Sequence, residues 1–238
     1  MVQLTDKRPT PSNVPINMRF RFRKRGRLMY ISHLDLVRTF GKIVVRSRLP
    51  LWFTEGFNPK PKMVFSPPLS LGVESETEFL DLRLTEHVDP ALALAAMNRS
   101  VTDELRMLEA YEPEEKLGAI RYLSYDVRIR TAGADDALAA ACERTLLSDD
   151  IPYLKRGKAG ERLVNLRTGI EELSVTYEDG ELRMRALLDA DPASFLNPQR
   201  LVDVLKDKHG ILSSPDILSE DVHILRLQAY RADKTLFR

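Results

Sequence analysis

Residues 17–25 alternate between apolar and basic side chains in the run NMRFRFRKR. A period of two is typical of a β-strand whose two faces differ. We expect Met18, Phe20 and Phe22 to face a core, because only that side of the strand offers apolar surface. The arginines that alternate with them are expected to line the opposite, open face of the sheet: Arg19, Arg21, Arg23 and Arg25.

A helix is predicted shortly after this strand. Ser32 and Asp35 have the spacing of a capping box, in which a short hydroxyl side chain caps the first turn and a carboxylate follows three residues later. The apolar positions that follow recur every three or four residues and predict a helix that ends near Ser47. Its expected buried stripe is Leu34, Val37, Phe40, Gly41 and Val44.

The pattern of elements continues along the chain and then repeats. In the first half, further strands are expected at 63–65, 78–84 and 104–111, with a helix at 91–97. In the second half, strands are expected at 122–130, 170–177, 182–188 and 222–230, with helices at 135–147 and 198–208. Asp179 followed by Gly180 predicts a two-residue hairpin turn. Each half therefore has the order strand–helix–strand–strand–helix–strand.

This order is the split βαβ pattern of a ferredoxin-like fold, in which both helices cover one face of an antiparallel sheet. We predict an α+β protein built from two tandem ferredoxin-like domains with antiparallel sheets. The first domain, which is basic, is expected at 17–111 and the second at 120–238. A linker at 112–119 joins them, and a flexible lead at 1–16 precedes them. Residues 151–164 do not fit this order and are expected to form another strand or a loop.

Composition excludes several kinds of site. Cys142 is the only cysteine in 238 residues, which excludes an internal disulfide, a multi-cysteine zinc site and an iron–sulfur cluster held by this chain alone. The histidines lack metal-ligand spacing and there is no Walker or dinucleotide-binding glycine motif, so we expect neither a metal nor a cofactor. No stretch approaches the roughly 20 apolar residues that span a bilayer. Charged residues stand where a signal peptide needs an apolar block, so we expect a cytoplasmic protein without a membrane partner.

Charge is distributed unevenly along the chain. Residues 1–62 contain 14 Lys and Arg but only 3 Asp and Glu, whereas residues 63–119 contain 4 and 12. Such an imbalance attracts a polyanion or an acidic partner. The alternative is that the basic segment pairs with the acidic segment inside the molecule, which would cancel its field.

Further basic and aromatic residues extend the candidate nucleic-acid interface beyond the strand. Cations recur every four residues on the predicted helix, at Arg38, Lys42 and Arg46, and two more, Lys60 and Lys62, lie in a proline-stiffened loop. Guanidinium groups bind phosphate through paired hydrogen bonds, so several in a row can follow a nucleic-acid backbone. Exposed aromatic rings can stack on bases, and the candidates for this are Tyr30 and Phe57, with core packing as the alternative.

His33 is the candidate catalytic residue. It is the only histidine in the basic segment 1–62, and a base among cations could activate a ribose hydroxyl for strand cleavage. The alternative is an ordinary residue at the start of a helix, which contacts backbone or solvent.

Three segments resemble a known family. Residues 30–38 (YISHLDLVR), 56–62 (GFNPKPK) and 68–75 (PLSLGVES) are similar, in this order, to the bacterial radical-SAM-linked domain of unknown function. That domain occurs alone or as a C-terminal extension of cobalamin-binding radical-SAM proteins. The resemblance implies association with a radical-SAM enzyme and with RNA-processing and ribosome-related genes, and it supplies no catalytic residues. The chain lacks the three-cysteine motif of the enzyme, so that chemistry would belong to the partner.

The sequence thus leads to one hypothesis and two alternatives. The leading hypothesis is a non-catalytic RNA-binding or adaptor protein that acts with a radical-SAM enzyme or with RNA-processing machinery. The first alternative is a metal-independent ribonuclease that uses His33. The second is a protein-interaction module whose basic face receives an acidic partner.

Overall fold

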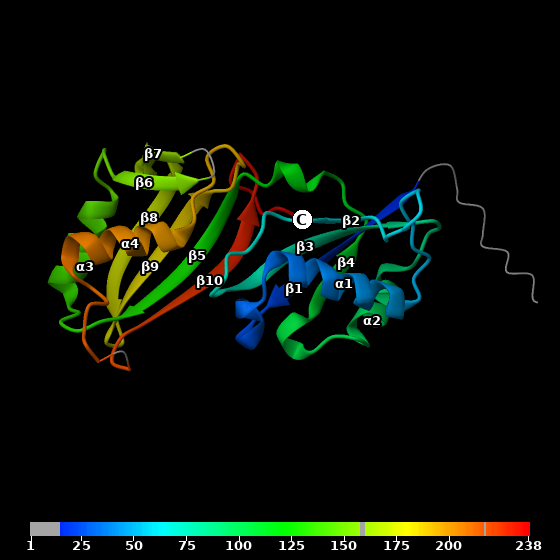
Figure 1. The fold of residues 1–238 in the computed structure, drawn as a ribbon, viewed down its shortest axis with the longest axis horizontal. Helices are drawn as coiled ribbons and strands as arrows, with labels where there is room; N and C mark the ends of the chain where they lie inside the picture. Colours follow the sequence, from blue (N-terminus) through cyan, green and yellow to red (C-terminus); the bar gives the residue numbers. More distant parts are fainter. Residues whose placement is uncertain (1–14, 158–159, 217) are drawn as a thin grey trace, which may run out of the picture. The chain divides into compact units, whose positions relative to one another are not determined.

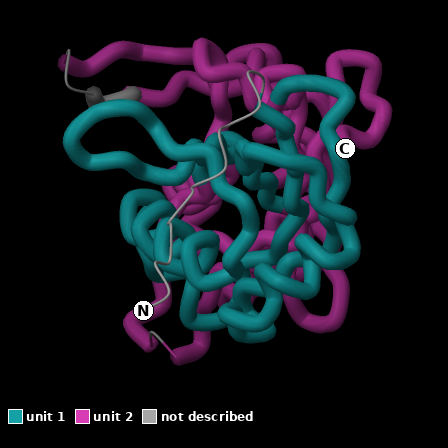
Figure 2. The backbone as a smooth tube through the Cα atoms, turned by 90° about the vertical axis from the view of Figure 1, so that its right-hand side faces the viewer, with its two compact units in different colours: residues 1–68, 78–116 teal, residues 69–77, 117–238 magenta. Residues whose placement is uncertain are grey.

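The chain divides into two compact units. The computed structural model describes residues 15–157, 160–216 and 218–238 (Figure 1). Unit 1 comprises Met1–Pro68 and Glu78–Lys116, and unit 2 comprises Leu69–Thr77 and Leu117–Arg238 (Figure 2). Residues 1–14 of the expected flexible lead lie outside the described residues. No sequence pattern indicated that residues 69–77 group with the second unit, and the predicted boundaries at 111 and 120 stay predictions.

Unit 1 is built from a four-stranded sheet and two α-helices. Its elements in chain order are β1 (Ile16–Lys24), the 3₁₀ helix η1 (Gly26–Tyr30), α1 (His33–Ser47), β2 (Met63–Phe65), β3 (Val73–Leu84), α2 (Pro90–Asn98), η2 (Asp103–Leu105) and β4 (Met107–Tyr111). The strands lie in the order β4–β1–β3–β2, with β4 antiparallel to β1 and β2 antiparallel to β3. The first five residues of β3 belong to unit 2 and the remaining seven to unit 1.

The core of unit 1 lies between this sheet and its helices. Met18, Phe20 and Phe22 are fully buried there, as the alternation in β1 predicts. The ring of Phe22 lies 4.8 Å from that of Phe40 on α1, measured between ring centroids. The predicted stripe on α1 needs correction, because Leu34 is 57% exposed. The buried residues of α1 are Leu36, Phe40, Ile43, Val44 and Ser47.

Unit 2 repeats the order of unit 1 with one added hairpin. Its own elements in chain order are η3 (Leu117–Ala119), β5 (Tyr122–Arg130), α3 (Asp136–Leu146), β6 (Pro152–Gly157), β7 (Gly160–Asn165), η4 (Leu166–Gly169), β8 (Ile170–Glu178), β9 (Glu181–Asp189), α4 (Pro198–His209) and β10 (Asp221–Tyr230). The strands lie in the order β10–β5–β9–β8 and all three of these pairings are antiparallel. On its other side, β10 pairs in parallel with residues 73–75 of β3.

Local chemistry explains where several elements of unit 2 begin and end. Asp179 and Gly180 both have positive φ, 53° and 85°, which is the backbone of a two-residue hairpin turn. Asn197 caps α4 by accepting a hydrogen bond from the backbone N–H of Gln199, and Pro198 occupies the first turn. The segment at 151–164, which the sequence left open between strand and loop, forms the hairpin β6–β7, a two-stranded sheet of its own.

The coarse fold class is confirmed. The described residues form an α+β protein with mostly antiparallel sheets and four α-helices. None of these helices is long and apolar enough to cross a bilayer, as far as the described residues extend.

Candidate nucleic-acid interface

Arg19 does not face solvent. Its side chain is completely buried, and its Nε and Nη2 donate to the two carboxylate oxygens of Asp81 at 2.7 and 2.8 Å. Nη2 also donates to the carbonyl of Glu115, and the guanidinium lies 5.9 Å from the centroid of the Phe79 ring. The expectation that Arg19 lines an open face is therefore wrong, because the segment after β4 covers this position and Asp81 neutralises its charge.

Arg21 and Arg23 on β1 are also held by groups of unit 1, and Arg25 directly follows the strand. Arg21 Nη2 lies 2.6 Å from a carboxylate oxygen of Glu109. Arg23 Nε donates to the backbone carbonyl of Asp103 at 2.6 Å, and Asp103 carries a carboxylate 4.0 Å from Arg23 Nη2. Arg25 is half-buried and its backbone N–H bonds to the carbonyl of Glu104. The partners come from the acidic segment 63–119, so on β1 the intramolecular alternative describes the charge better than an open cationic face does.

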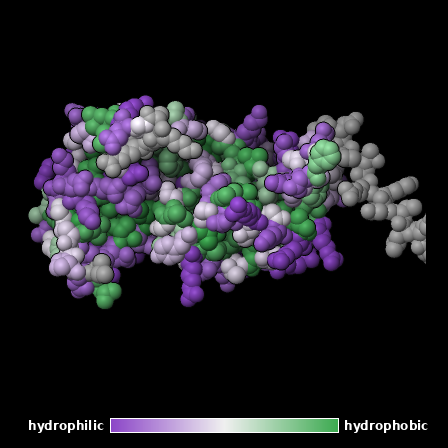
Figure 3. All heavy atoms as spheres, viewed as in Figure 1, coloured by the Kyte–Doolittle hydropathy of each residue, from purple (hydrophilic) through white to green (hydrophobic). Residues whose placement is uncertain are grey.

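The cations of α1 lie in a different environment. Arg38, Lys42 and Arg46 are all exposed, and Figure 3 shows hydrophilic side chains gathered over α1. At 1.5 Å per residue, their four-residue spacing places successive cations about 6 Å apart along the helix axis. Arg38 pairs with Asp35, one turn earlier, at 3.1 Å. Among the described residues, neither Lys42 nor Arg46 has an ion-pair partner.

Residues 54–62 present a second exposed group of cations and one ring. The loop is held at its base, because the Thr54 backbone N–H donates to the carbonyl of Lys60 and the Lys62 N–H to that of Trp52, both at 2.9 Å. Lys60 and Lys62 are exposed and no described carboxylate pairs with either. Phe57 lies at the tip, fully exposed. Tyr30, at the end of η1, is 69% exposed, so core packing is excluded for both rings.

His33 is exposed at the first residue of α1. Its ring lies edge-on to Phe65, with 5.8 Å between the centroids. The capping geometry around it is as predicted, since Ser32 Oγ accepts from the Asp35 backbone N–H at 3.1 Å. Within the part of the chain that the structure describes, no carboxylate orients the imidazole of His33, so nothing here holds it as a general base. Its catalytic role stays a prediction.

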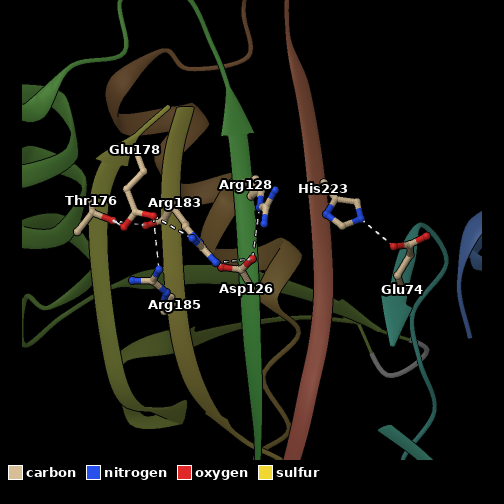
Figure 4. A network of polar contacts seen from close by, with 8 residues as sticks. All are labelled: Glu74, Asp126, Arg128, Thr176, Glu178, Arg183, Arg185 and His223. Carbon is tan, nitrogen blue, oxygen red and sulfur yellow. Dashed lines mark hydrogen bonds and ion pairs between the residues drawn. The ribbon is translucent and has the colours of Figure 1, made fainter. Parts of the chain in front are cut away.

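The sheet of unit 2 carries arginines that the sequence analysis missed (Figure 4). Arg183 on β9 donates to Asp126 on β5 at 2.7 Å and to Glu178 on β8 at 2.9 Å. Arg128 contacts Asp126 and Arg185 contacts Glu178, each at 3.4 Å. The alternation in residues 127–130 (VRIR) and 182–185 (LRMR) is the same signal that marked β1. Like Arg19 and Arg21 in unit 1, these three arginines are paired with carboxylates of their own unit.

A second contact in Figure 4 joins His223 on β10 to Glu74 at the start of β3. His223 Nε2 lies 2.9 Å from a carboxylate oxygen of Glu74, beside the parallel pairing of the two strands. The contact supports the assignment of residues 69–77 to unit 2.

Comparison with known proteins identifies the family. Residues 17–198 match a family described as an uncharacterized protein conserved in bacteria, DUF2344. The chain belongs to the DUF2344 family. The match to DUF2344 covers most of the chain and includes every residue of the candidate interface. The comparison with curated proteins finds no match for this DUF2344 chain.

Among solved structures, a chain in "Crystal Structure of a Cbf5-Nop10-Gar1 Complex" is similar to the DUF2344 chain, with a TM-score of 0.48 and 9% sequence identity. The similarity covers 89% of this chain and 48% of the other. The DUF2344 chain therefore spans about half the length of that chain.

Two further site types can be judged from the geometry of this DUF2344 protein. Among residues 15–157, 160–216 and 218–238, no three His, Cys, Asp or Glu side chains are grouped to hold a metal ion. Cys142 is buried on α3, and this burial raises the pKa of its thiol to about 11, so the reactive thiolate is strongly disfavoured.

Proposed function

We propose that this protein binds RNA without cleaving it, through the exposed face of α1 and the loop at 54–62 in unit 1. The proposed contacts to phosphate are Arg38, Lys42, Arg46, Lys60 and Lys62. The proposed contacts to bases are Tyr30 and Phe57. The arginines of β1 are left out of this interface as direct contacts, because Asp81 and Glu109 already occupy two of them and the others are half-buried.

The observation that carries the proposal is the contrast between the two sets of cations. Carboxylates of unit 1 lie against three arginines of β1: Arg19, Arg21 and Arg23. Four other cations have no ion-pair partner among the described residues: Lys42, Arg46, Lys60 and Lys62. Arg38 has only an exposed pair with Asp35, which costs little to exchange for a phosphate. A positive field therefore remains over α1 and the loop, and such a field attracts a polyanion.

Exposed rings beside these cations favour RNA with unpaired bases. Phe57 is fully exposed at the tip of a loop, where an apolar ring gains nothing from the protein's own packing. A base that stacks on such a ring contributes about 1–3 kcal/mol to binding, for any base type. Single-stranded RNA offers both phosphates and unpaired bases that can stack on these rings, whereas the bases of a duplex are paired with each other.

The experiment is a binding titration of single-stranded RNA at several salt concentrations. If five phosphates are neutralised, the slope of log affinity against log salt should be about −3.5 for a single strand and about −4.5 for a duplex. Lys42→Glu with Arg46→Glu should abolish binding, and Phe57→Ala should weaken it at least about fivefold. A matched control reverses two other exposed arginines of unit 1, Arg99→Glu with Arg106→Glu, and should bind as the wild type does.

The alternatives give different results in the same assay. Salt-insensitive binding, or equal loss in the control variant, would contradict the proposal. Cleavage of the RNA that disappears in His33→Ala would favour the ribonuclease. An acidic protein that stays bound after nuclease treatment, while RNA does not bind, would favour the interaction module.

Two finer expectations belong to the same proposal. The tandem ferredoxin-like arrangement is supported by the strand order, which places the fourth, first, third and second strands side by side in both units. An adaptor role with a radical-SAM enzyme rests on the resemblance of residues 30–38, 56–62 and 68–75 alone. Copurification of such an enzyme with the wild type would support it.

A further inference from the structure

Unit 2 contains a groove that none of the functions considered above uses. It has a volume of about 970 Å³ and lies along α3, α4 and the start of β6; we call it the α3–α4 groove. Ile151 and Val204 give it buried apolar surface, whereas Arg144, Arg200 and Lys208 are exposed cations in its lining. A volume of this size is within the usual range for small-molecule sites, which combine apolar walls with a few polar groups.

Tyr153 and Arg200 line both the α3–α4 groove and a second hollow of about 370 Å³. The second hollow is lined in part by the β6–β7 hairpin. Arg200 Nη1 donates to the Tyr153 hydroxyl at 2.5 Å and to Asp203 at 3.1 Å, and the guanidinium lies 5.1 Å from the centroid of the Tyr153 ring. These contacts fix the plane of the guanidinium through one nitrogen. No described residue hydrogen-bonds to its Nε or Nη2, so the three N–H groups of these two nitrogens remain for a ligand.

One end of the groove is fixed by a contact between its two helices. Thr145 Oγ1 on α3 lies 2.8 Å from His209 Nε2 on α4. Arg144 and Lys208 are the chain neighbours of this pair, and both line the groove. The contact therefore sets the distance between the helices where the two cations stand.

The lining of the two hollows is more basic than the rest of this half of the chain. It contains four cations, Arg144, Arg162, Arg200 and Lys208, but only two carboxylates, Asp150 and Asp207. Residues 120–238 as a whole contain 18 Lys and Arg against 20 Asp and Glu. Arg144, Arg162 and Lys208 have no ion-pair partner in the part of the chain that the structure describes.

Helix dipoles explain only part of this concentration of charge. Cations near the last turn of a helix interact favourably with its dipole, which accounts for Arg144 and Lys208 on their own elements. Arg200 lies in the first turn of α4, where the dipole disfavours a cation and only the pair with Asp203 offsets it, and Arg162 lies on a strand. A ligand that carries negative charge accounts for all four.

We propose that the α3–α4 groove binds a phosphorylated small molecule of nucleotide size. Arg200 would hold a phosphate group through Nε and Nη2 in the paired geometry that guanidinium and phosphate share. Arg144 and Lys208 add cations at the other end, and Ile151 and Val204 contact the apolar part of the ligand. This site lies entirely in unit 2 and does not depend on the RNA interface proposed for unit 1.

The test is calorimetric titration of the full chain with uridine monophosphate, inorganic pyrophosphate and uridine as probes. Uridine monophosphate and pyrophosphate should bind saturably, and uridine should not. Arg144→Gln with Lys208→Gln should weaken binding about tenfold or more, since each removes a charge-assisted contact. Arg200→Lys should also weaken it, because a lysine keeps the charge but loses the paired donors.

Lys206→Gln is the matched control, because Lys206 is exposed on the same helix but does not line the groove. It should bind the probes as the wild type does. The Arg144→Gln/Lys208→Gln variant should keep its affinity for RNA, which separates this site from the unit 1 interface. Three results would overturn the proposal: no saturable binding of either phosphorylated probe, equal loss in Lys206→Gln, or uridine binding as tightly as its monophosphate.

Discussion

Removing either member of the Arg19–Asp81 pair should destabilise unit 1 strongly. Arg19 is completely buried, whereas the Asp81 side chain is 17% exposed. Breaking a buried ion pair by removing one partner costs about 3–5 kcal/mol, because the other charge remains buried without compensation. Arg19→Met leaves a carboxylate that can still reach some water, so its cost should be near the lower limit. Asp81→Leu leaves a buried guanidinium without its paired acceptor, so its cost should be near the upper limit.

The chain offers a probe for this experiment. Trp52 is the only tryptophan and belongs to unit 1, so its fluorescence during urea titration follows the unfolding of that unit. If the free energy of unfolding falls by about 2 kcal/mol per molar urea, a loss of about 4 kcal/mol in that free energy lowers the midpoint of urea unfolding by about 2 M. The control is Arg21→Met, which breaks a partly exposed pair with Glu109 and should cost about 1 kcal/mol or less. Arg19→Met with Asp81→Leu should lose less stability than either single variant, because no unpaired charge is left.

Two results would refute this reasoning. A shift of the urea midpoint for Arg19→Met as small as that for Arg21→Met would mean that burial does not determine how much stability is lost when an ion pair is broken. An Arg19→Met variant that unfolds like the wild type but loses RNA affinity would mean that Arg19 contacts the ligand after all.

Three further predictions concern local chemistry. Ser32→Ala should destabilise α1 by about 1 kcal/mol through loss of its cap. It should also raise the pKa of Asp35, which the Ser32 hydroxyl and then Arg38 hold below its usual value, and carboxyl NMR titration would measure this change. Since the pKa of Asp35 is lowered in the folded protein, its contribution to stability is present above the usual carboxylate range and is lost as the pH falls through the lowered value. Gly180→Val should cost about 1–2 kcal/mol in thermal unfolding, because φ is 85° there. Cys142 should resist a thiol reagent at pH 8 and react within minutes once urea unfolds the chain, and rapid labelling of the folded protein would contradict its burial.

Local signals in the sequence predicted most of the elements. The cap at Ser32, the turn at Asp179–Gly180 and the apolar face of β1 each depend on neighbours within a few residues, and each has the expected geometry. The buried face of α1 was harder to predict, and the predicted and observed stripes share only Phe40 and Val44. Two registers of apolar residues were available, and only packing against the sheet decides between them.

The candidate site was predicted less well, for a physical reason. Periodicity places Arg19 on the face away from the helices, but it cannot reveal what covers that face. The partner of Arg19 is 62 residues away in the sequence, and Glu115 is 96 residues away. The cations on α1 and in the loop at 54–62 are not covered by segments distant in the sequence. Their exposure could therefore be predicted from local spacing alone. The arginines of β5 and β9 carried the same alternation as those of β1, and extending that argument to the second half would have found them.

The pairing of β10 with residues 73–75 has a practical consequence for anyone who divides this protein. A fragment that starts at residue 117 would include all of β10 but not the strand beside it, and would also lose the hydrogen bond from Thr77 to the carbonyl of Leu227. One side of β10 would then present unpaired backbone N–H and C=O groups that can pair with a strand of another molecule. Such a fragment should self-associate at concentrations where the intact chain does not. Adding a peptide that spans residues 69–77 should cover the exposed side of β10 and reverse the self-association.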